Sequence, residues 1–371
     1  MNSIEKTLEV RVVDRGRITR ARLTEEAGRV RLIEADDDAG DVELFVSPGW
    51  ADLHTHVYDG VTQISVRPDR VGLDAGVHVL GDAGSAGQAT VRGLLEYVMP
   101  QARTEVRVWL NIGSHGLVHL REVSDAEFID VDATLAAIAA HREAICGVKV
   151  RSSGSIVGAM GLAPLQLGRL VAREAGLPLL VHIGEAPPPI DDVLDLLDAG
   201  DVVTHCFHGK TGYPWTRDGA PVPALARAGE RGVLLDVGHG AASFDYWVAR
   251  RAVQAGHLPD SISTDIHVRN IDGPVHSLAA VMTKLYAAGM PLADVLQAVT
   301  TTPRAILGAD RPWRSADGTV EHATVFRIAA GAAPELANGG TAGAGAGAAI
   351  DLAGHIVPEA VIVAGRYEKV G

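Results

Sequence analysis

Short apolar runs alternate with longer amphipathic stretches along the chain from Leu44 to about Leu307. The short runs are rich in β-branched residues and are typical of the buried strands of a parallel sheet. Four of the longer stretches have the apolar spacing of helices, at 89–99, 164–176, 191–200 and 245–256. We expect eight strands, which end near His54, Asp82, Asn111, Lys149, His182, His205, Val237 and Asp265. Strands that alternate with helices predict an α/β fold, and eight such units close into a (β/α)8 TIM barrel.

The two ends of the chain show a different pattern. Residues 1–47 alternate apolar and polar positions, and 319–328 and 354–366 also have the pattern of short strands. We therefore expect the terminal segments to pair into a small β-sandwich domain beside the barrel. The expected division of the chain is a first part of the β-domain at 1–47, the barrel at 48–312, and a second part of the β-domain at 313–371 with a mobile Ala/Gly-rich loop at 329–349.

A doubly wound open sheet is the alternative arrangement for alternating strands and helices. Such a fold usually has fewer strands and a glycine-rich phosphate loop after the first of them. The first strand here ends instead in the sequence GWADLHTHVYDG at 49–60, which carries two histidines. This difference favours the closed barrel.

The composition indicates a folded globular protein that does not bind polyanions. Of the 371 residues 47% are hydrophobic and 21% are charged, and the formal net charge is −13. This acidity argues against nucleic acid or an anionic membrane as a partner. The first residues carry charges where a signal peptide has an apolar core, and no apolar run could span a bilayer, so we expect a cytoplasmic protein. Two cysteines, Cys146 and Cys206, are too few for a disulfide framework.

Side chains that can bind a metal stand at the expected carboxyl ends of five strands. In a TIM barrel these ends meet at one rim, where the active sites of this architecture lie. His54 and His56 share one strand face because side chains alternate with a period of two. A single histidine such as His182 or His205 is more simply read as a core residue, but the joint placement favours a metal centre. The candidate ligands are His54, His56, Lys149, His182, His205 and Asp265.

Lys149 requires its own explanation. It shares a strand face with Ile145 and Gly147, so we expect its side chain to point into the barrel. A buried ammonium group is costly unless it is paired or chemically altered. The amine can add carbon dioxide to form a carbamate, an anionic ligand that can bridge two divalent ions.

The order of these residues resembles the amidohydrolase superfamily, whose members use a metal centre, often binuclear, in a (β/α) barrel. The resemblance is carried by H-T-H at 54–56 and by Lys149, His182, His205 and Asp265 in that order, and it covers nearly the whole chain. Three further segments resemble the deacetylase branch that is close to the dihydroorotases, namely GDAGSAGQAT at 81–90, NIGSHGLV at 111–118 and GVKVRSSG at 147–154.

The resemblance implies two divalent ions, with Zn²⁺ the best match to the mixed nitrogen and oxygen ligands and Mn²⁺ the alternative. The implied ligands are His54, His56 and Asp265 for one ion, His182 and His205 for the other, and Lys149, carbamylated by carbon dioxide, as the bridge. A hydroxide between the ions would be the nucleophile. Asp265 would act as general base and then as general acid.

Three residues are candidates for substrate contact. Arg151 lies two residues beyond Lys149 and has either a bidentate contact with a substrate carboxylate or a salt bridge at the rim. Tyr58 follows the H-T-H strand directly. Ser85 lies in the run DAGSAG, which is either a turn or a segment whose backbone N–H groups face the substrate.

We therefore expect a hydrolase that cleaves an amide or ester bond of a small acylated substrate, as a deacetylase of an N-acetyl amino acid or an O-acetyl hydroxy acid. A cyclic amidase of the dihydroorotase or hydantoinase kind is the first alternative. A non-catalytic scaffold protein with the same fold is the second. No residue pattern specifies the oligomeric state, although enzymes of this superfamily often form homo-oligomers.

Overall fold

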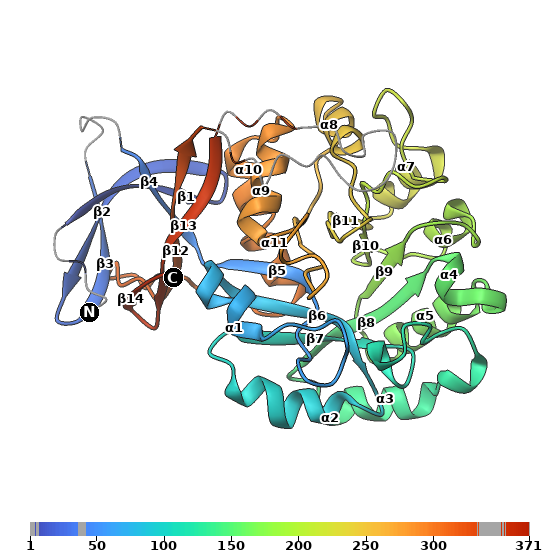
Figure 1. Cartoon of the computed structure of the whole chain (residues 1–371). Helices are drawn as coiled ribbons and strands as arrows, with labels where there is room; N and C mark the ends of the chain where they lie inside the picture. Colours follow the sequence, from blue (N-terminus) through green and yellow to red (C-terminus); the bar gives the residue numbers. More distant parts are fainter. Residues whose placement is uncertain are drawn as a thin grey trace.

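The computed structural model describes residues 4, 7–35, 42–331, 333, 350, 352 and 354–370. A group of parallel strands with helices around it lies beside a β-rich part that contains both chain ends (Figure 1). This arrangement confirms the expected TIM barrel with a small β-domain. Most of the loop that we expect to be mobile, at 329–349, lies outside the described residues.

Seven parallel strands form the barrel sheet and follow one another in chain order. They are β5 (Trp50–Thr55), β6 (Val77–Gly87), β7 (Glu105–Asn111), β8 (Ile145–Ser152), β9 (Leu179–Ile183), β10 (Val202–Thr204) and β11 (Leu234–Asp236). Almost all their side chains are buried, as expected for parallel strands that are covered on both faces. Five of the expected strand ends fall within or at the end of these strands, and His205 and Val237 follow β10 and β11, respectively, by one residue.

The expected eighth strand is present as the segment 261–266, which makes single bridges to both edges of the sheet. Ser261 pairs with Asp236 of β11 and Ile266 pairs with Thr55 of β5, both in the parallel sense. The segment therefore closes the sheet between its first and last strands. A regular ladder does not continue to its end because Asp265 has a φ of +49°, outside the strand region.

Helices and helical turns connect the strands and pack outside them (Figure 1). They are α1 (Pro68–Val71), η1 (Leu73–Ala75), α2 (Val91–Gly93), η2 (Leu94–Val98), η3 (Met99–Gln101), η4 (Gly116–Val118), η5 (Ala126–Phe128), α3 (Val131–Ala140), α4 (Gly154–Val157), η6 (Gly158–Met160), α5 (Ala163–Ala175), α6 (Ile190–Asp195), α7 (Pro223–Glu230), α8 (Tyr246–Gln254), α9 (Leu278–Ala287), α10 (Leu292–Gln297) and α11 (Thr301–Ile306). Among the described residues no single helix has the length and apolarity to cross a membrane; only the bent pair at 154–160 and 163–175 meets that test together, by length and composition.

The expected helices at 164–176 and 245–256 are confirmed as α5 and α8, and the two others differ from expectation. The stretch 89–99 forms three short helical pieces, α2, η2 and η3, because Pro100 provides no N–H and its ring crowds the preceding turn. The stretch 191–200 is helical only in α6. It ends early because Asp198 N donates to Asp201 Oδ2 at 2.8 Å, which forms a turn stabilised by a side chain.

The β-domain consists of one seven-stranded sheet in the order β14, β13, β12, β4, β1, β2, β3. Its strands are β1 (Leu8–Asp14), β2 (Arg17–Glu26), β3 (Arg29–Glu34), β4 (Leu44–Pro48), β12 (His322–Ala330), β13 (Gly354–Val363) and β14 (Arg366–Lys369). The sheet curls until its edges meet, and Val30 N donates to Gly365 O at 2.8 Å. The expected β-sandwich is thus a single curled sheet with its own apolar core.

The two parts pack directly against each other. Trp50, which begins the first barrel strand, lies 5.5 Å from Phe326 of β12 between ring centroids. His78 Nε2 donates to Ala323 O at 3.0 Å across the same boundary. These contacts hold the amino-terminal ends of the barrel strands against the β-domain, and the metal-binding candidates lie at the opposite ends.

Candidate metal centre

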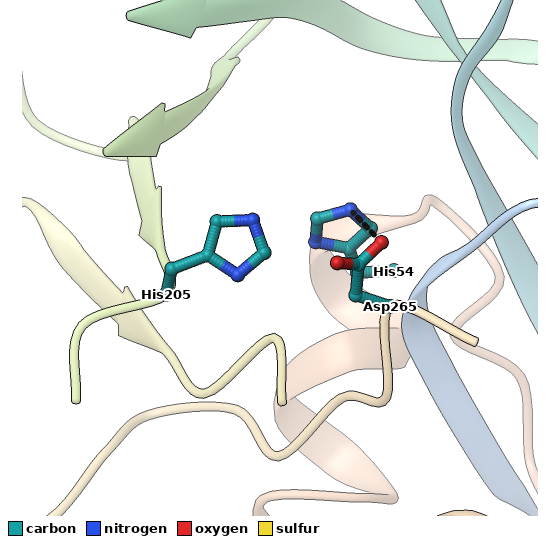
Figure 2. A group of neighbouring side chains, drawn as sticks. All are labelled: His54, His205 and Asp265. Atoms are coloured by element: carbon teal, nitrogen blue, oxygen red, sulfur yellow. Dashed lines mark ion pairs between the residues drawn. The ribbon is translucent and has the colours of Figure 1, made fainter. Parts of the chain in front are cut away.

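All six sequence-predicted ligands meet at the carboxyl ends of the barrel strands. One ligand atom each of His54, His205 and Asp265 lies within 4.8 Å of the others, and Figure 2 shows the three side chains facing one another. His56 Nε2 is 2.9 Å from Asp265 Oδ1. The other two candidates join at the same place: Lys149 Nζ is 3.3 Å from His54 Nε2, and His182 Nδ1 is 2.9 Å from His205 Nε2.

The hydrogen bonds of His54 determine which of its nitrogens carries the proton. Its Nδ1 is 2.9 Å from Thr204 Oγ1, and Thr204 Oγ1 donates its only hydrogen to Asp236 Oδ2 at 2.7 Å. His54 Nδ1 must therefore be the donor in the first contact. The free lone pair of Nε2 then faces Lys149 and Asp265 Oδ1, the latter at 3.4 Å. Burial, with the Lys149 charge, holds the pKa of His54 well below its usual range, which keeps the ring neutral.

His205 follows the same rule through a backbone contact. Its Nδ1 lies 2.5 Å from the carbonyl oxygen of Gly238, which can only accept, so Nδ1 carries the proton and Nε2 has the lone pair. Burial lowers the pKa of His205 to about 3, and the ring is neutral. Outer contacts also orient the other two histidines: His56 Nδ1 is 3.0 Å from Ser85 Oγ, and His182 Nε2 is 3.1 Å from Ser153 Oγ.

Lys149 lies inside the barrel, as its strand face predicts, and is 1% exposed. Burial lowers the pKa of its ammonium group to about 7, so loss of the proton costs little near neutrality. The neighbouring strand provides the room: Gly84 has a φ of +83°, and a Cβ there would lie 2.6 Å from Lys149 Cγ. Within the run DAGSAG, Gly84 is therefore needed because any larger residue would collide with the Lys149 side chain.

Asp265 is held in an unusual backbone conformation at the end of the closing segment. Its φ of +49° is left-handed, and its backbone is fixed on both sides: its N–H donates to His54 O at 2.7 Å and its carbonyl accepts from Asn270 Nδ2 at 2.8 Å. Burial would raise the pKa of the carboxyl, but His54 and His56 outweigh burial and hold that pKa well below its usual range. Asp265 is therefore an anion beside the neutral rings of His54 and His205.

This donor set fits a divalent metal. The lone pair of His54 Nε2 faces the anionic carboxylate, with no hydrogen between Nε2 and Asp265 Oδ1 at 3.4 Å, and His205 offers a ligand atom within 4.8 Å of both residues. Buried acceptors that face one another repel unless a cation lies between them. Neutral imidazoles whose second nitrogen donates to an oxygen, together with a carboxylate, are the ligands that Zn²⁺ and similar ions prefer.

The three candidates for substrate contact lie close to this centre but are already engaged. Arg151 Nε and Nη2 donate to the Glu122 carboxylate at 2.7 and 2.6 Å, and Glu122 is fully buried. The salt bridge expected as one alternative for Arg151 is thus present, and within the part of the chain that the structure describes only Nη1 of its guanidinium has no hydrogen-bond partner. Tyr58 OH donates to Thr90 O at 2.7 Å, and Ser85 Oγ is occupied by His56.

The sequence did not identify the residues that orient the candidate ligands and Arg151 through hydrogen bonds. Thr204, Asp236 and Glu122 lie in no recognised motif, and the motif GVKVRSSG, which includes Ser153, did not mark that serine as the partner of His182; each of the four contacts a residue far away in the chain. One signal was present for Thr204 and Asp236. Both end β-rich runs, and strand ends gather at one rim of a barrel.

Known proteins are similar to this chain in sequence and in fold. No family model matches the chain. A deacetylase of Agrobacterium fabrum is 43% identical over 287 residues, which are 76% of this chain and 70% of the relative. The chain belongs to the amidohydrolase superfamily.

Solved structures from the same superfamily agree. A crystal structure described as a dihydroorotase is 35% identical and covers 98% of this chain and 99% of its own, with a TM-score of 0.84. Another, described as an adenine deaminase, is 28% identical, covers 98% of this chain and 100% of its own, and has a TM-score of 0.83. This chain is therefore a hydrolase of the amidohydrolase superfamily. The proteins similar to it are named after different reactions.

Proposed function

We propose that this amidohydrolase is a metal-dependent deacetylase of small acylated acids, either N-acetyl amino acids or O-acetyl hydroxy acids. The observation that carries the proposal is the set of neutral histidine lone pairs around the buried Asp265 anion. The deacetylase name of a 43% identical relative supports the reaction class.

In this proposal the chain holds two divalent ions, most simply Zn²⁺. His54, His56 and Asp265 would hold one and His182 and His205 the other. Lys149 would bridge them after its amine has added carbon dioxide. The low pKa of Lys149 favours this addition, because only the neutral amine reacts with carbon dioxide.

Bound ions supply a water molecule of lowered pKa and polarise the scissile carbonyl group. The residues of the chain move the proton. Asp265 Oδ1 faces His54 and His56, so we assign the transferred proton to Oδ2. Asp265 would accept it there during attack and return it to the leaving amine or alcohol. The buried rings of His54 and His205 stay neutral and do not compete for that proton.

Arg151 is the candidate for recognition of the substrate carboxylate. Glu122 fixes the guanidinium through Nε and Nη2, so Nη1 is presented in one orientation. A fixed charged donor loses little entropy when it binds an anion. We expect the double variant Glu122→Leu/Arg151→Met, which leaves no unpaired buried charge, to raise KM for substrates with a free carboxylate, and to change KM little for the corresponding primary amides.

A cyclic amidase is the second candidate, because a structure described as a dihydroorotase matches this chain over nearly its full length. The same centre could open a ring amide. A non-catalytic scaffold is the least favoured reading, since all the ligand positions are occupied by residues that can bind a metal.

A hydrolysis screen separates these candidates. The purified protein would be supplied with Zn²⁺ and bicarbonate and assayed on N-acetyl and O-acetyl acids, on dihydroorotate and on hydantoins. Release of acetate supports the deacetylase. Ring opening without acetate release would replace it with the cyclic amidase, and no turnover of any substrate would favour the scaffold.

A further inference from the structure

A short glycine-containing segment, Gly238–Gly240, lies between two of the candidate ligands. His205 Nδ1 donates to Gly238 O at 2.5 Å. On the other side a Cβ at Gly240 would lie 2.6 Å from Asp265 Oδ2. The backbone of this segment thus lies against both His205 and Asp265.

The backbone N–H groups of the segment are tied to the strand-like segment that closes the barrel. His239 N donates to Ser263 O at 3.1 Å, and Gly240 N donates to Thr264 O at 2.9 Å. These bonds connect it to the residues directly before Asp265. The side chain of His239 makes further contacts of this segment.

The His239 ring is held from three directions. It stacks on Phe244 with centroids 4.4 Å apart, and its Nδ1 is 2.9 Å from Gly240 O, which can only accept. Nδ1 therefore carries the proton and Nε2 is an acceptor. That acceptor receives Lys284 Nζ at 2.9 Å.

Lys284 is a buried lysine that the proposed reaction does not use. It belongs to α9 and is fully buried, and burial lowers the pKa of its amine to about 8. Nζ also donates to Pro274 O at 2.9 Å. Pro274 lies in the loop after Asp265, where Asn270 binds the Asp265 carbonyl. One amine group therefore connects the loop that contacts His205 with the loop that follows Asp265.

We propose that Lys284 and His239 are positioning residues of the candidate metal centre, which set the spacing of His205 and Asp265 through the Gly238–Gly240 segment. An apolar side chain would be cheaper to bury on helix α9 than a lysine. The geometry gives a reason for the lysine, since only a long donor reaches both loops from the helix. The inference rests on the proposed function, because it presupposes that the centre binds a metal.

The test is Zn²⁺ affinity, measured by competition with a chromophoric chelator, in the full-length protein and in K284M. Methionine preserves the length and burial of the side chain and removes both donors. We expect K284M to melt cooperatively with native circular dichroism and to bind Zn²⁺ about 10-fold more weakly, the lower end of the effect seen for groups that orient metal ligands.

Thr283→Val is the matched control. Thr283 is the preceding residue of α9, is equally buried, and accepts from Ile356 N of the β-domain at 3.0 Å instead of contacting the two loops. It should affect thermal stability without changing Zn²⁺ affinity. If K284M does not fold, His239→Asn replaces it as the deciding variant, because the amide N–H of asparagine can still donate to Gly240 O, while the shorter side chain has no acceptor at the position of His239 Nε2, where Lys284 binds.

The outcomes are distinct. Weaker Zn²⁺ binding by K284M or His239→Asn, with Thr283→Val unchanged, supports the positioning role. Equal affinity in wild type and the deciding variant overturns it and leaves the proposed function intact. A wild-type protein that binds no Zn²⁺ overturns the proposed function itself.

Discussion

Lys149 Nζ lies 3.3 Å from His54 Nε2, and both groups are buried. The nitrogen of His54 that faces the lysine carries a lone pair, because the other nitrogen donates to Thr204. An amine and an imidazole lone pair are thus placed together where neither reaches bulk water. This relationship connects the buried lysine to the histidine cluster and underlies the first two predictions.

Lys149→Ala should lose the bridged metal pair and at least about 100-fold in turnover, because the ions would lack a shared ligand. The barrel should still fold, since deletion of a buried amine removes a desolvation cost. Metal content by elemental analysis and far-UV circular dichroism check the two expectations. Lys369→Ala makes the same change at the surface and should alter neither property. Unchanged metal content in Lys149→Ala contradicts the bridging role.

Thr204→Val should weaken metal binding by about 10- to 100-fold, because His54 would lose the partner that fixes its tautomer. Asp236 would also lose one of the two hydroxyl groups that donate to its Oδ2. Thr204→Ser retains the hydroxyl and should restore affinity. Chelator competition measures both variants. Equal affinity in the valine and serine variants would show that the hydroxyl does not orient His54.

Glu122→Gln should destabilise the fold by about 3 kcal/mol, because Arg151 would remain largely buried without its counterion. The double variant Glu122→Leu/Arg151→Met removes both charges and should lose less stability than the single variant. Urea denaturation followed by tryptophan fluorescence measures the free energy of unfolding. A double variant less stable than Glu122→Gln would contradict this expectation, because it would show that the Glu122–Arg151 pair makes a net favourable contribution to the free energy of unfolding.

His78 should make the free energy of unfolding depend on pH below neutrality. Burial, with the charge of Arg304, lowers its pKa from 6.5 to about 3 in the folded protein. The unfolded chain therefore binds the proton more readily between these values, and stability falls as the pH falls from 6.5 toward 3, by up to about 1.4 kcal/mol per pH unit. His78→Gln keeps a donor for Ala323 O and cannot titrate.

The measurement for His78 is urea denaturation at several pH values between 4 and 8. We expect the slope of stability against pH to be shallower in His78→Gln than in the wild type. The exposed His115, changed to glutamine, is the control and should leave the slope unaltered. Parallel slopes for wild type and His78→Gln would show that His78 is not buried in its neutral form at the domain boundary.

The barrel and its candidate ligands could be predicted because two simple periodicities determine them. Side-chain alternation places His54 and His56 on one face, and the barrel brings the strand ends together. The left-handed backbone of Asp265 could not be predicted, because it depends on hydrogen bonds with His54 and Asn270. His54 is far away in the sequence, and no sequence pattern marks Asn270 as a partner. The same holds for Thr204 and Asp236, which are 32 residues apart in the chain.

The secondary-structure prediction was wrong where a tertiary contact or a proline determines the helix. Pro100 changes the helical type of 89–99, and the Asp201 side chain ends α6 before the apolar pattern does. Arg151 was ambiguous for a similar reason. Its partner Glu122 comes from a loop without a sequence pattern, so only the folded chain shows which edge of the guanidinium is occupied.

Metal content per chain tests the central claim most directly. Purified protein, grown with added zinc and dialysed against metal-free buffer with bicarbonate, would be analysed by elemental mass spectrometry together with Lys149→Ala. We predict about two divalent ions per wild-type chain, which is the number expected for five histidine and aspartate ligands and a bridge. A wild-type protein without bound metal, or one that holds the same metal as Lys149→Ala, would contradict the account.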